Sequence, residues 1–180
     1  MHLKFKQRGN FSVEFAIVGI VLSVIFVFSA DVIVKLSIRG KLDRLSFSLV
    51  NVLKERTQLY DEDYEIKNIS EANIIYTIAS NSLQRTLNSY ESSRFGAVVE
   101  QLTFKSIGHA NLPKTYIFGA YSCSLSQTIK DFEYLSVVTS WDRQATLYRV
   151  TLCYRTDNTF GSLINESYAR VSSSSVMIGR

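Results

Sequence analysis

The feature that most constrains this chain is a stretch of twenty residues, 11–30, in which Glu14 is the only charged residue. As a helix with a rise of 1.5 Å per residue, the stretch would be about 30 Å long, which matches the hydrocarbon core of a bilayer. Lys4, Lys6 and Arg8 precede it without any acidic residue. Because basic flanks stay on the cytoplasmic side, the sequence predicts one membrane span with the rest of the chain outside the cytoplasm.

Three kinds of targeting segment fit this pattern. The first is a permanent signal anchor, and the second is a secretory signal peptide cut after Ser29. The third is a prepilin-like signal cut after Gly9, which leaves Asn10 as the first residue. An ionisable group inside a membrane segment is costly and indicates function, and the first two kinds have no use for Glu14. In a filament, Glu14 of one subunit can pair with the new amine of Asn10 in the next, which favours the third interpretation.

The charge balance argues against a nucleic-acid partner. The net charge is +4, with 20 basic and 16 acidic residues, but three of the basic residues lie before Gly9. The remaining 17 basic and 16 acidic residues leave a balance of +1, without the clustered basic face that nucleic-acid binding needs. Phosphate-binding glycine loops are missing from the sequence, and His2 and His109 are its only histidines. We therefore expect a protein that is not an enzyme.

The two cysteines, Cys123 and Cys153, have more than one interpretation. In an oxidising compartment they can form a disulfide whose loop of about thirty residues would stabilise the fold by roughly 3–4 kcal/mol. The alternatives are two buried thiols, or a Cys123 nucleophile close to His109, and we favour the disulfide. We expect no metal site and no cofactor site. The segment 61–65 is rich in acidic residues, but it lacks the glycine and the spaced ligands of a calcium loop. We therefore interpret it as a solvated loop, with a calcium site as the alternative.

Helical periodicity continues beyond the membrane segment. Apolar residues recur at spacings of three and four at Leu42, Leu45, Leu49, Val52 and Leu53. This pattern predicts one helix over residues 11–59 with Gly40 as a weak point, and two separate helices are the alternative. The resulting division is a leader at 1–9, a transmembrane helix at 10–34, an amphipathic extension at 35–60 and an extracytoplasmic α+β head at 61–180.

The sequence of the head predicts one further helix, and beyond it the apolar residues recur at every second position, as in strands. Asn68 and Glu71 form a candidate capping box for a helix that ends near Tyr90. Strands are predicted at 97–107, 115–123, 135–140, 145–156 and 168–178, with a short helix or loop at 124–132 and a turn at 157–161. Helices followed by a run of strands predict an α+β fold with an antiparallel sheet.

Several segments resemble proteins of the tight-adherence (Tad) pilus systems. The basic leader, Gly9, Glu14, Phe15 and the apolar helix are similar to the processing signals of Tad pseudopilins. Residues 42–50, 53–60, 151–154, 157–158 and 173–180 are similar to the TadF family rather than to its sister family TadE. The resemblance therefore covers most of the chain and is weakest between residues 108 and 146.

The resemblance implies a pilin-like head and a function for the chain. It implies cleavage between Gly9 and Asn10 by a membrane aspartic prepilin peptidase, with Glu14 as the family's glutamate and Phe15 as the aromatic residue that follows it. It implies a minor component of a type IVc (Flp) pilus that supports surface adherence and biofilm formation. The long outer domain favours a tip, initiation or assembly role over that of the repeating fibre subunit.

The resemblance also implies a set of partners and a location. The partners are Flp and TadE-like pilins, the prepilin peptidase, the inner-membrane assembly platform and membrane lipid. The chain would cross the inner membrane once, with its C-terminal domain in the periplasm, and would either stay there or enter the pilus. The alternative function is an uncleaved single-pass membrane protein with a periplasmic sensor or interaction domain.

Overall fold

The structure is a computed structural model that describes the backbone of residues 10–59 and 65–179 and the side chains of residues 11–55 and 65–179. The leader at 1–9, residues 60–64 with the acidic Asp61, Glu62 and Asp63, and Arg180 lie outside the described residues. The helices are α1 (Asn10–Leu59), α2 (Ile69–Thr86) and α3 (Thr159–Leu163), with 3-10 helices η1 (Ser92–Arg94) and η2 (Ile129–Leu135). The strands are β1 (Phe95–Leu102), β2 (Phe104–Ser106), β3 (His109–Ala110), β4 (Lys114–Gly119), β5 (Leu147–Arg155) and β6 (Arg170–Ile178).

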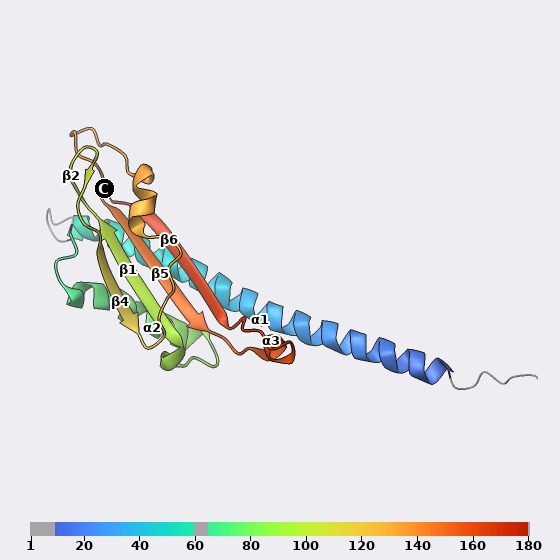
Figure 1. Cartoon of the computed structure of the whole chain (residues 1–180). Helices are drawn as coiled ribbons and strands as arrows, with labels where there is room; N and C mark the ends of the chain where they lie inside the picture. Colours follow the sequence, from blue (N-terminus) through green and yellow to red (C-terminus); the bar gives the residue numbers. More distant parts are fainter. Residues whose placement is uncertain (1–9, 60–64, 180) are drawn as a thin grey trace, which may run out of the picture.

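Helix α1 is one continuous helix of 50 residues, as the periodicity predicts, and the alternative of two separate helices is wrong. It runs unbroken through Gly40, where a side chain would meet no other atom within 4 Å. The C-terminal half of α1 lies behind the sheet, and the N-terminal half projects well beyond the head (Figure 1). The molecule therefore has the shape of a head mounted on a rod.

The head is built on a four-stranded antiparallel sheet with strand order β4-β1-β5-β6, so the predicted α+β fold with an antiparallel sheet is confirmed. Strands β2 and β3 form a small separate hairpin. Strands β1 and β5 occupy the centre of the sheet and are almost entirely buried, and both contain β-branched and aromatic residues, which favour strands. All strands of the main sheet run along the direction of α1 (Figure 1).

Helices α1 and α2 cover one face of the sheet, here called the inner face. The core between them consists mainly of apolar side chains from α1 (Leu42, Leu49, Val50, Leu53), from α2 (Ala72, Ile75, Ala79, Leu83) and from β1 and β5 (Phe95, Ala97, Val99, Tyr148, Val150, Leu152, Tyr154). The predicted stripe of α1 is wrong at Val52, which is 52% exposed. Ser46, which is fully buried, lies on the covered side of α1 instead.

The connection between β4 and β5 covers part of the opposite, outer face. Ile129 of η2 packs with Leu102 and Leu147 in a second, smaller core. The disulfide between Cys123 and Cys153 ties the start of this connection to β5. Gly96 lies beneath it, because a Cβ atom there would stand 1.8 Å from the carbonyl oxygen of Tyr121.

Several predicted boundaries differ from the structure. Helix α2 ends at Thr86 rather than near Tyr90, because Leu87 turns to an extended conformation. Its predicted capping box is incomplete, since the Asn68 side chain makes no cap hydrogen bond and Glu71 accepts from the Lys67 N–H at 3.1 Å. The strand predicted at 97–107 is interrupted at Thr103, between β1 and β2.

Residues 135–140 do not form the predicted strand. Leu135 closes η2, and beyond it only Val138 makes an isolated bridge, to Gln144. Val137 and Val138 are 54% and 48% exposed, so they have no partner surface that would favour a regular strand. Residues 157–161, predicted as a turn, form a turn only in part, because 159–161 are the first residues of the short helix α3.

Candidate functional site

The uncovered half of α1 is a long apolar surface that needs a partner. Residues 11–30 are exposed except for half-buried Val27, and Phe11, Phe15 and Phe26 are 70–79% exposed. Within the described ranges, α1 is the one helix long and apolar enough to cross a membrane. An apolar surface of this size is not left in water, so lipid or other apolar helices must cover it.

Glu14 and Phe15 lie near the start of this uncovered half. Both side chains are exposed on the helix, and the ring of Phe15 stacks with that of Phe11 one turn earlier, at a centroid distance of 6.3 Å. Asn10 is the first residue of α1, and Gly9 lies outside the described residues. The positive end of the helix dipole falls among these residues and favours a carboxylate close to it.

A charged pair marks the other end of the apolar segment. Lys35 forms an ion pair with Asp31, one turn earlier, and their side chains are only 17% and 9% exposed. The two residues line a cavity of about 360 Å³ between α1 and the head, together with Phe26, Val27, Ala30, Val34 and Ile38 of α1 and Ser89, Arg94, Tyr154, Thr156, Asp157 and Thr159 of the head. The transition from an apolar to a charged helix surface therefore coincides with the point where the head begins.

Arg94 lines this cavity on the side of the head. Its guanidinium donates to Asp157 at 2.6 Å and to Glu91 at 3.0 Å. The hydrogen bond to Asp157 raises the pKa of Arg94 above its ordinary value, so the group stays charged. These contacts connect η1 with the turn that follows β5.

The buried ion pair between Glu100 and Arg149 was not predicted from the sequence. The two residues face each other across β1 and β5, with side chains 2% and 3% exposed. Arg149 also donates to the Gln127 carbonyl at 2.8 Å and lies 5.5 Å from the centre of the Phe132 ring. One feature of the sequence could have indicated the pair: Glu100 stands in a strand pattern whose other residues on the same face are apolar. A charge on such a face needs a buried partner.

This pair has a structural arrangement rather than a catalytic one. The second carboxylate oxygen of Glu100 accepts from the Ile129 N–H at 3.3 Å, so both oxygens have donors. Both residues fix the connection between β4 and β5 on the outer face. A general acid or base would instead need one oxygen directed at an open site.

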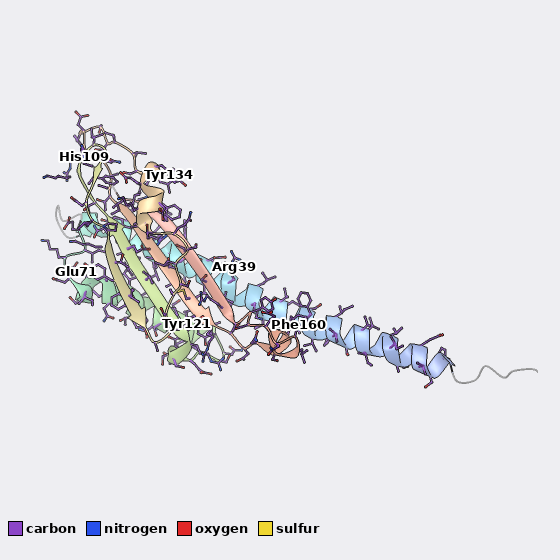
Figure 2. All side chains as sticks on the ribbon, viewed as in Figure 1. Arg39, Glu71, His109, Tyr121, Tyr134 and Phe160 are labelled. Atoms are coloured by element: carbon purple, nitrogen blue, oxygen red, sulfur yellow. A yellow bond between two sulfur atoms is a disulfide. The ribbon has the colours of Figure 1, made fainter. Side chains whose placement is uncertain are left out.

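The candidate nucleophile and base are not brought together. Cys123 is bonded to Cys153 across a Cα–Cα distance of 5.6 Å, and Cys153 pairs with Gly96 near the end of the sheet that faces α3. His109 lies at the opposite end of the head, on the exposed hairpin of β2 and β3 (Figure 2). A thiolate nucleophile activated by this histidine is therefore not supported.

Metal ligands do not gather within residues 10–59 and 65–179, where three or more His, Cys, Asp or Glu side chains nowhere come together. Glu65, the one described member of the acidic segment, accepts from Lys114 at 2.9 Å and from the Thr103 hydroxyl at 3.3 Å. The hydrogen bond from Lys114 raises the pKa of that lysine. Asp61, Glu62 and Asp63, the other acidic residues of the candidate calcium loop, lie outside the described residues.

A second cavity, of about 400 Å³, lies at the end of the head away from the helical rod. Its lining mixes charges of both signs with two aromatic residues: Glu65, Lys67, Lys105, Asp142 and Arg143 line it together with Phe104 and Trp141. Trp141 is 82% exposed. The cavity is open and carries no set of convergent groups that would define a chemistry.

Comparison with known proteins identifies the family. The family model TadF, described as "Putative tight adherence pilin protein F", matches residues 2–180. No curated protein and no solved structure matches the chain. A pilin family implies a structural role, and the apolar half of α1 fits a membrane-anchored pilin. The chain belongs to the TadF family of tight adherence pilin proteins.

Proposed function

We propose that this chain is a minor pilin-like subunit that is cut between Gly9 and Asn10 and helps to assemble a Tad (type IVc, Flp) pilus. The observation that carries the proposal is the division of α1 into two halves. One half is an uncovered apolar rod, and the other is built into the core of the head. This arrangement suits a subunit that is held first in a bilayer and later among the helices of neighbouring subunits.

Glu14 is the proposed pairing site for the N-terminal amine. Cleavage would create a positive charge on Asn10 at the start of α1, at the edge of the apolar surface. A carboxylate from a neighbouring subunit offsets the cost of keeping that charge out of water, and the amine does the same for the carboxylate. Phe15 would pack beside this pair, and its stacking on Phe11 places two rings on the same side of the helix.

The proposed topology follows from the charges on both sides of the apolar segment. Lys4, Lys6 and Arg8 favour a cytoplasmic leader, so the head would lie in the periplasm. The disulfide fits that compartment, because disulfides persist in oxidising environments. The proposed domains are the leader at 1–9, the membrane helix at 10–34, its amphipathic extension at 35–60 and the head at 61–180.

The proposed partners are those of an assembly component. They are the prepilin peptidase, Flp and TadE-like pilins, and the inner-membrane assembly platform. Because the domain outside the membrane is long, we propose a role at the tip of the pilus, in its initiation or in its assembly, rather than as the repeating subunit of the fibre. Loss of the subunit would then reduce surface adherence and biofilm formation.

The test is the N-terminus of the mature protein. Mass spectrometry of protein from membrane and sheared-pilus fractions of its host should find Asn10 as the first residue. An intact Met1 in functional protein would refute the proposed cleavage and would favour an uncleaved single-pass membrane protein with a sensor or interaction domain.

The role of Glu14 needs a separate variant. Glu14→Ala should still be cleaved but should lower pilus output, because the amine of the neighbouring subunit loses its partner. Ser12→Ala, which changes an exposed residue in the first helical turn, is the matched control and should assemble normally. Normal pilus output from Glu14→Ala would refute the pairing role while leaving cleavage intact.

A further inference from the structure

We propose that residues 159–168, here called the α3 loop, insert apolar side chains into the surface of the membrane that α1 crosses. The loop comprises α3 and the turn that leads toward β6. The partner is the phospholipid interface on the side of the head. The proposal rests on α1 as a membrane helix and is independent of cleavage and of pilus assembly.

The position of the loop along α1 supplies the first argument. The ring of Phe160 contacts that of Phe28 edge to face, at a centroid distance of 4.8 Å. Phe28 lies seventeen residues beyond Phe11, which corresponds to about 26 Å along the helix, against a hydrocarbon core of about 30 Å. Figure 2 shows Phe160 beside α1, where the rod leaves the head. The contact therefore places the loop at the outer boundary of the hydrocarbon core.

The exposed side chains of the loop supply the second argument. Leu163, Ile164 and Tyr168 are 64%, 49% and 55% exposed. Residues 158–165 carry no charge, and Glu166 is the only charged residue within the loop. Aliphatic residues accompanied by a tyrosine are typical of the zone where hydrocarbon meets headgroups. At the outer boundary of the hydrocarbon core, a loop of this composition is suited to contact with lipid rather than with water.

The shape of the loop is fixed by internal hydrogen bonds. The Asn158 side chain donates to the Glu166 carbonyl at 2.6 Å and accepts from the Tyr168 N–H at 2.9 Å. The Glu166 N–H donates to the Gly161 carbonyl at 2.8 Å. Gly161 is needed here, because a Cβ atom would lie 2.2 Å from Oδ1 of Asn158. The apolar side chains are therefore held outward by a defined backbone rather than by a loose segment.

Two attachments to one membrane would restrict the orientation of the head. Helix α1 alone allows the head to tilt about the point where it leaves the bilayer. A second contact through the α3 loop, on the opposite end of the head from the β2–β3 hairpin, removes part of that freedom (Figure 1). A subunit that leaves the membrane for a filament would have to release this contact as well as α1.

The test uses the full chain in phosphatidylcholine–phosphatidylglycerol vesicles that contain lipids brominated along the acyl chain. Bromine quenches only an indole that lies in the bilayer. Trp141 is the single tryptophan of the chain and lies in the cavity at the far end of the head, so the native protein supplies an unquenched reference. Leu163→Trp in a Trp141→Phe background should lose emission, most strongly with bromines about 5–10 Å below the headgroup boundary.

Matched variants make the result decisive. Leu112→Trp in the same background introduces an indole at a site that is 90% exposed, in the segment between β3 and β4, and should remain unquenched. Tyr168→Trp should be quenched like Leu163→Trp, and it supplies a second position if one variant does not fold. Flotation of the vesicles confirms that α1 is inserted in every sample.

The opposite result would overturn the inference. If both loop variants float with the vesicles and keep unquenched, red-shifted emission, the loop lies in water. If their emission is blue-shifted but insensitive to bromine, a second copy of the chain covers the loop instead of lipid. Either outcome refutes the membrane contact, and the N-terminal analysis of the mature protein would still stand as a separate test of the proposed function.

Discussion

The hydroxyl of Ser46 on α1 lies 3.0 Å from that of Ser173 on β6, in the buried interface between the helix and the edge of the sheet. Ser46 also lies 2.9 Å from the Ser175 hydroxyl and donates to the Asp43 carbonyl at 3.1 Å. Small side chains on both surfaces let α1 lie close to β6. The serines of the C-terminal strand β6 are thus explained by the close packing of α1 against it.

Ser46→Leu should separate α1 from β6. The added carbons have no space in a closely packed interface, and the two serines of β6 lose a hydrogen-bond partner. Overpacking of this kind costs about 1–3 kcal/mol, which lowers the melting temperature of a chain of this size by about 2–4 °C per kcal/mol. Thermal unfolding in detergent, followed by near-ultraviolet circular dichroism, measures the effect. Ser48→Leu, on the exposed side of the same helix, is the control and should unfold like the native protein.

The buried pair of Glu100 and Arg149 should show strong coupling. Arg149→Met leaves the Glu100 carboxylate buried without its cation, which costs about 3–5 kcal/mol. The double variant Glu100→Leu with Arg149→Met removes both charges, so it should be more stable than the single variant. Denaturant unfolding of the native chain, of the single variants Glu100→Leu and Arg149→Met, and of the double variant gives the coupling energy.

A control variant on the same strand tests whether burial is the cause. Arg155→Met changes an exposed arginine at the end of β5 and should alter stability by less than about 0.5 kcal/mol. If the double variant were as unstable as Arg149→Met, the charge pairing would not explain the cost.

The contrast between these two clusters shows what the sequence can and cannot predict. The long helix, the second helix and the strands follow from periodicity, because each element buries one face. The Glu100–Arg149 pair depends on the register between β1 and β5, and that register is set by packing over a separation of 49 residues. The Ser46 contact depends likewise on how α1 lies on β6, 127 residues away.

The errors at the edges of elements have a physical origin as well. Residues 135–140 contain apolar side chains that resemble a strand, but the connection they belong to lies at the surface, where Val137 and Val138 stay about half exposed. Periodicity reports which side chains would be buried together and does not report whether a partner surface exists. Gly9 and the pairing of Glu14 are untested by the fold and remain predictions.

Reduction of the disulfide should loosen the outer face. The bridge between Cys123 and Cys153 closes a loop over a sequence separation of 30, which corresponds to about 3–4 kcal/mol in the loop-entropy model. Removing it with the double variant Cys123→Ser and Cys153→Ser should lower the melting temperature. Thiol labelling of the oxidised native chain should find both cysteines blocked. Two readily alkylated thiols in protein from the host would contradict the bridge.

Tyr90 should contribute to a loss of stability in alkali. Burial raises the pKa of its hydroxyl above the ordinary value of about 10, and the hydrogen bond with Ser80, at 2.7 Å, opposes that shift. Because the folded state holds the proton more tightly, the contribution is complete below about pH 10 and is lost as the pH rises through the folded pKa. Tyr90→Phe should therefore flatten the decline in unfolding free energy between about pH 9 and pH 11.

The alkaline experiment needs a tyrosine control. Tyr134→Phe alters a side chain that is 77% exposed and should leave the alkaline decline unchanged. Lys114, whose pKa the hydrogen bond to Glu65 raises, contributes a decline of the same sign in both variants and therefore cancels from the comparison. Identical pH profiles for Tyr90→Phe and the native chain would show that burial of the Tyr90 hydroxyl does not matter.

Two glycine-to-alanine substitutions should have opposite effects. At Gly40, in the middle of α1, a Cβ atom meets nothing within 4 Å, so Gly40→Ala should raise stability by about 0.5–1 kcal/mol through lower chain entropy in the unfolded state. At Gly96 a Cβ atom would stand 1.8 Å from the backbone oxygen of Tyr121 and 3.6 Å from Sγ of Cys123. Gly96→Ala must displace the segment that the disulfide anchors, so its melting temperature should fall. A stable Gly96→Ala protein with an intact disulfide would contradict the close approach of that segment to β1.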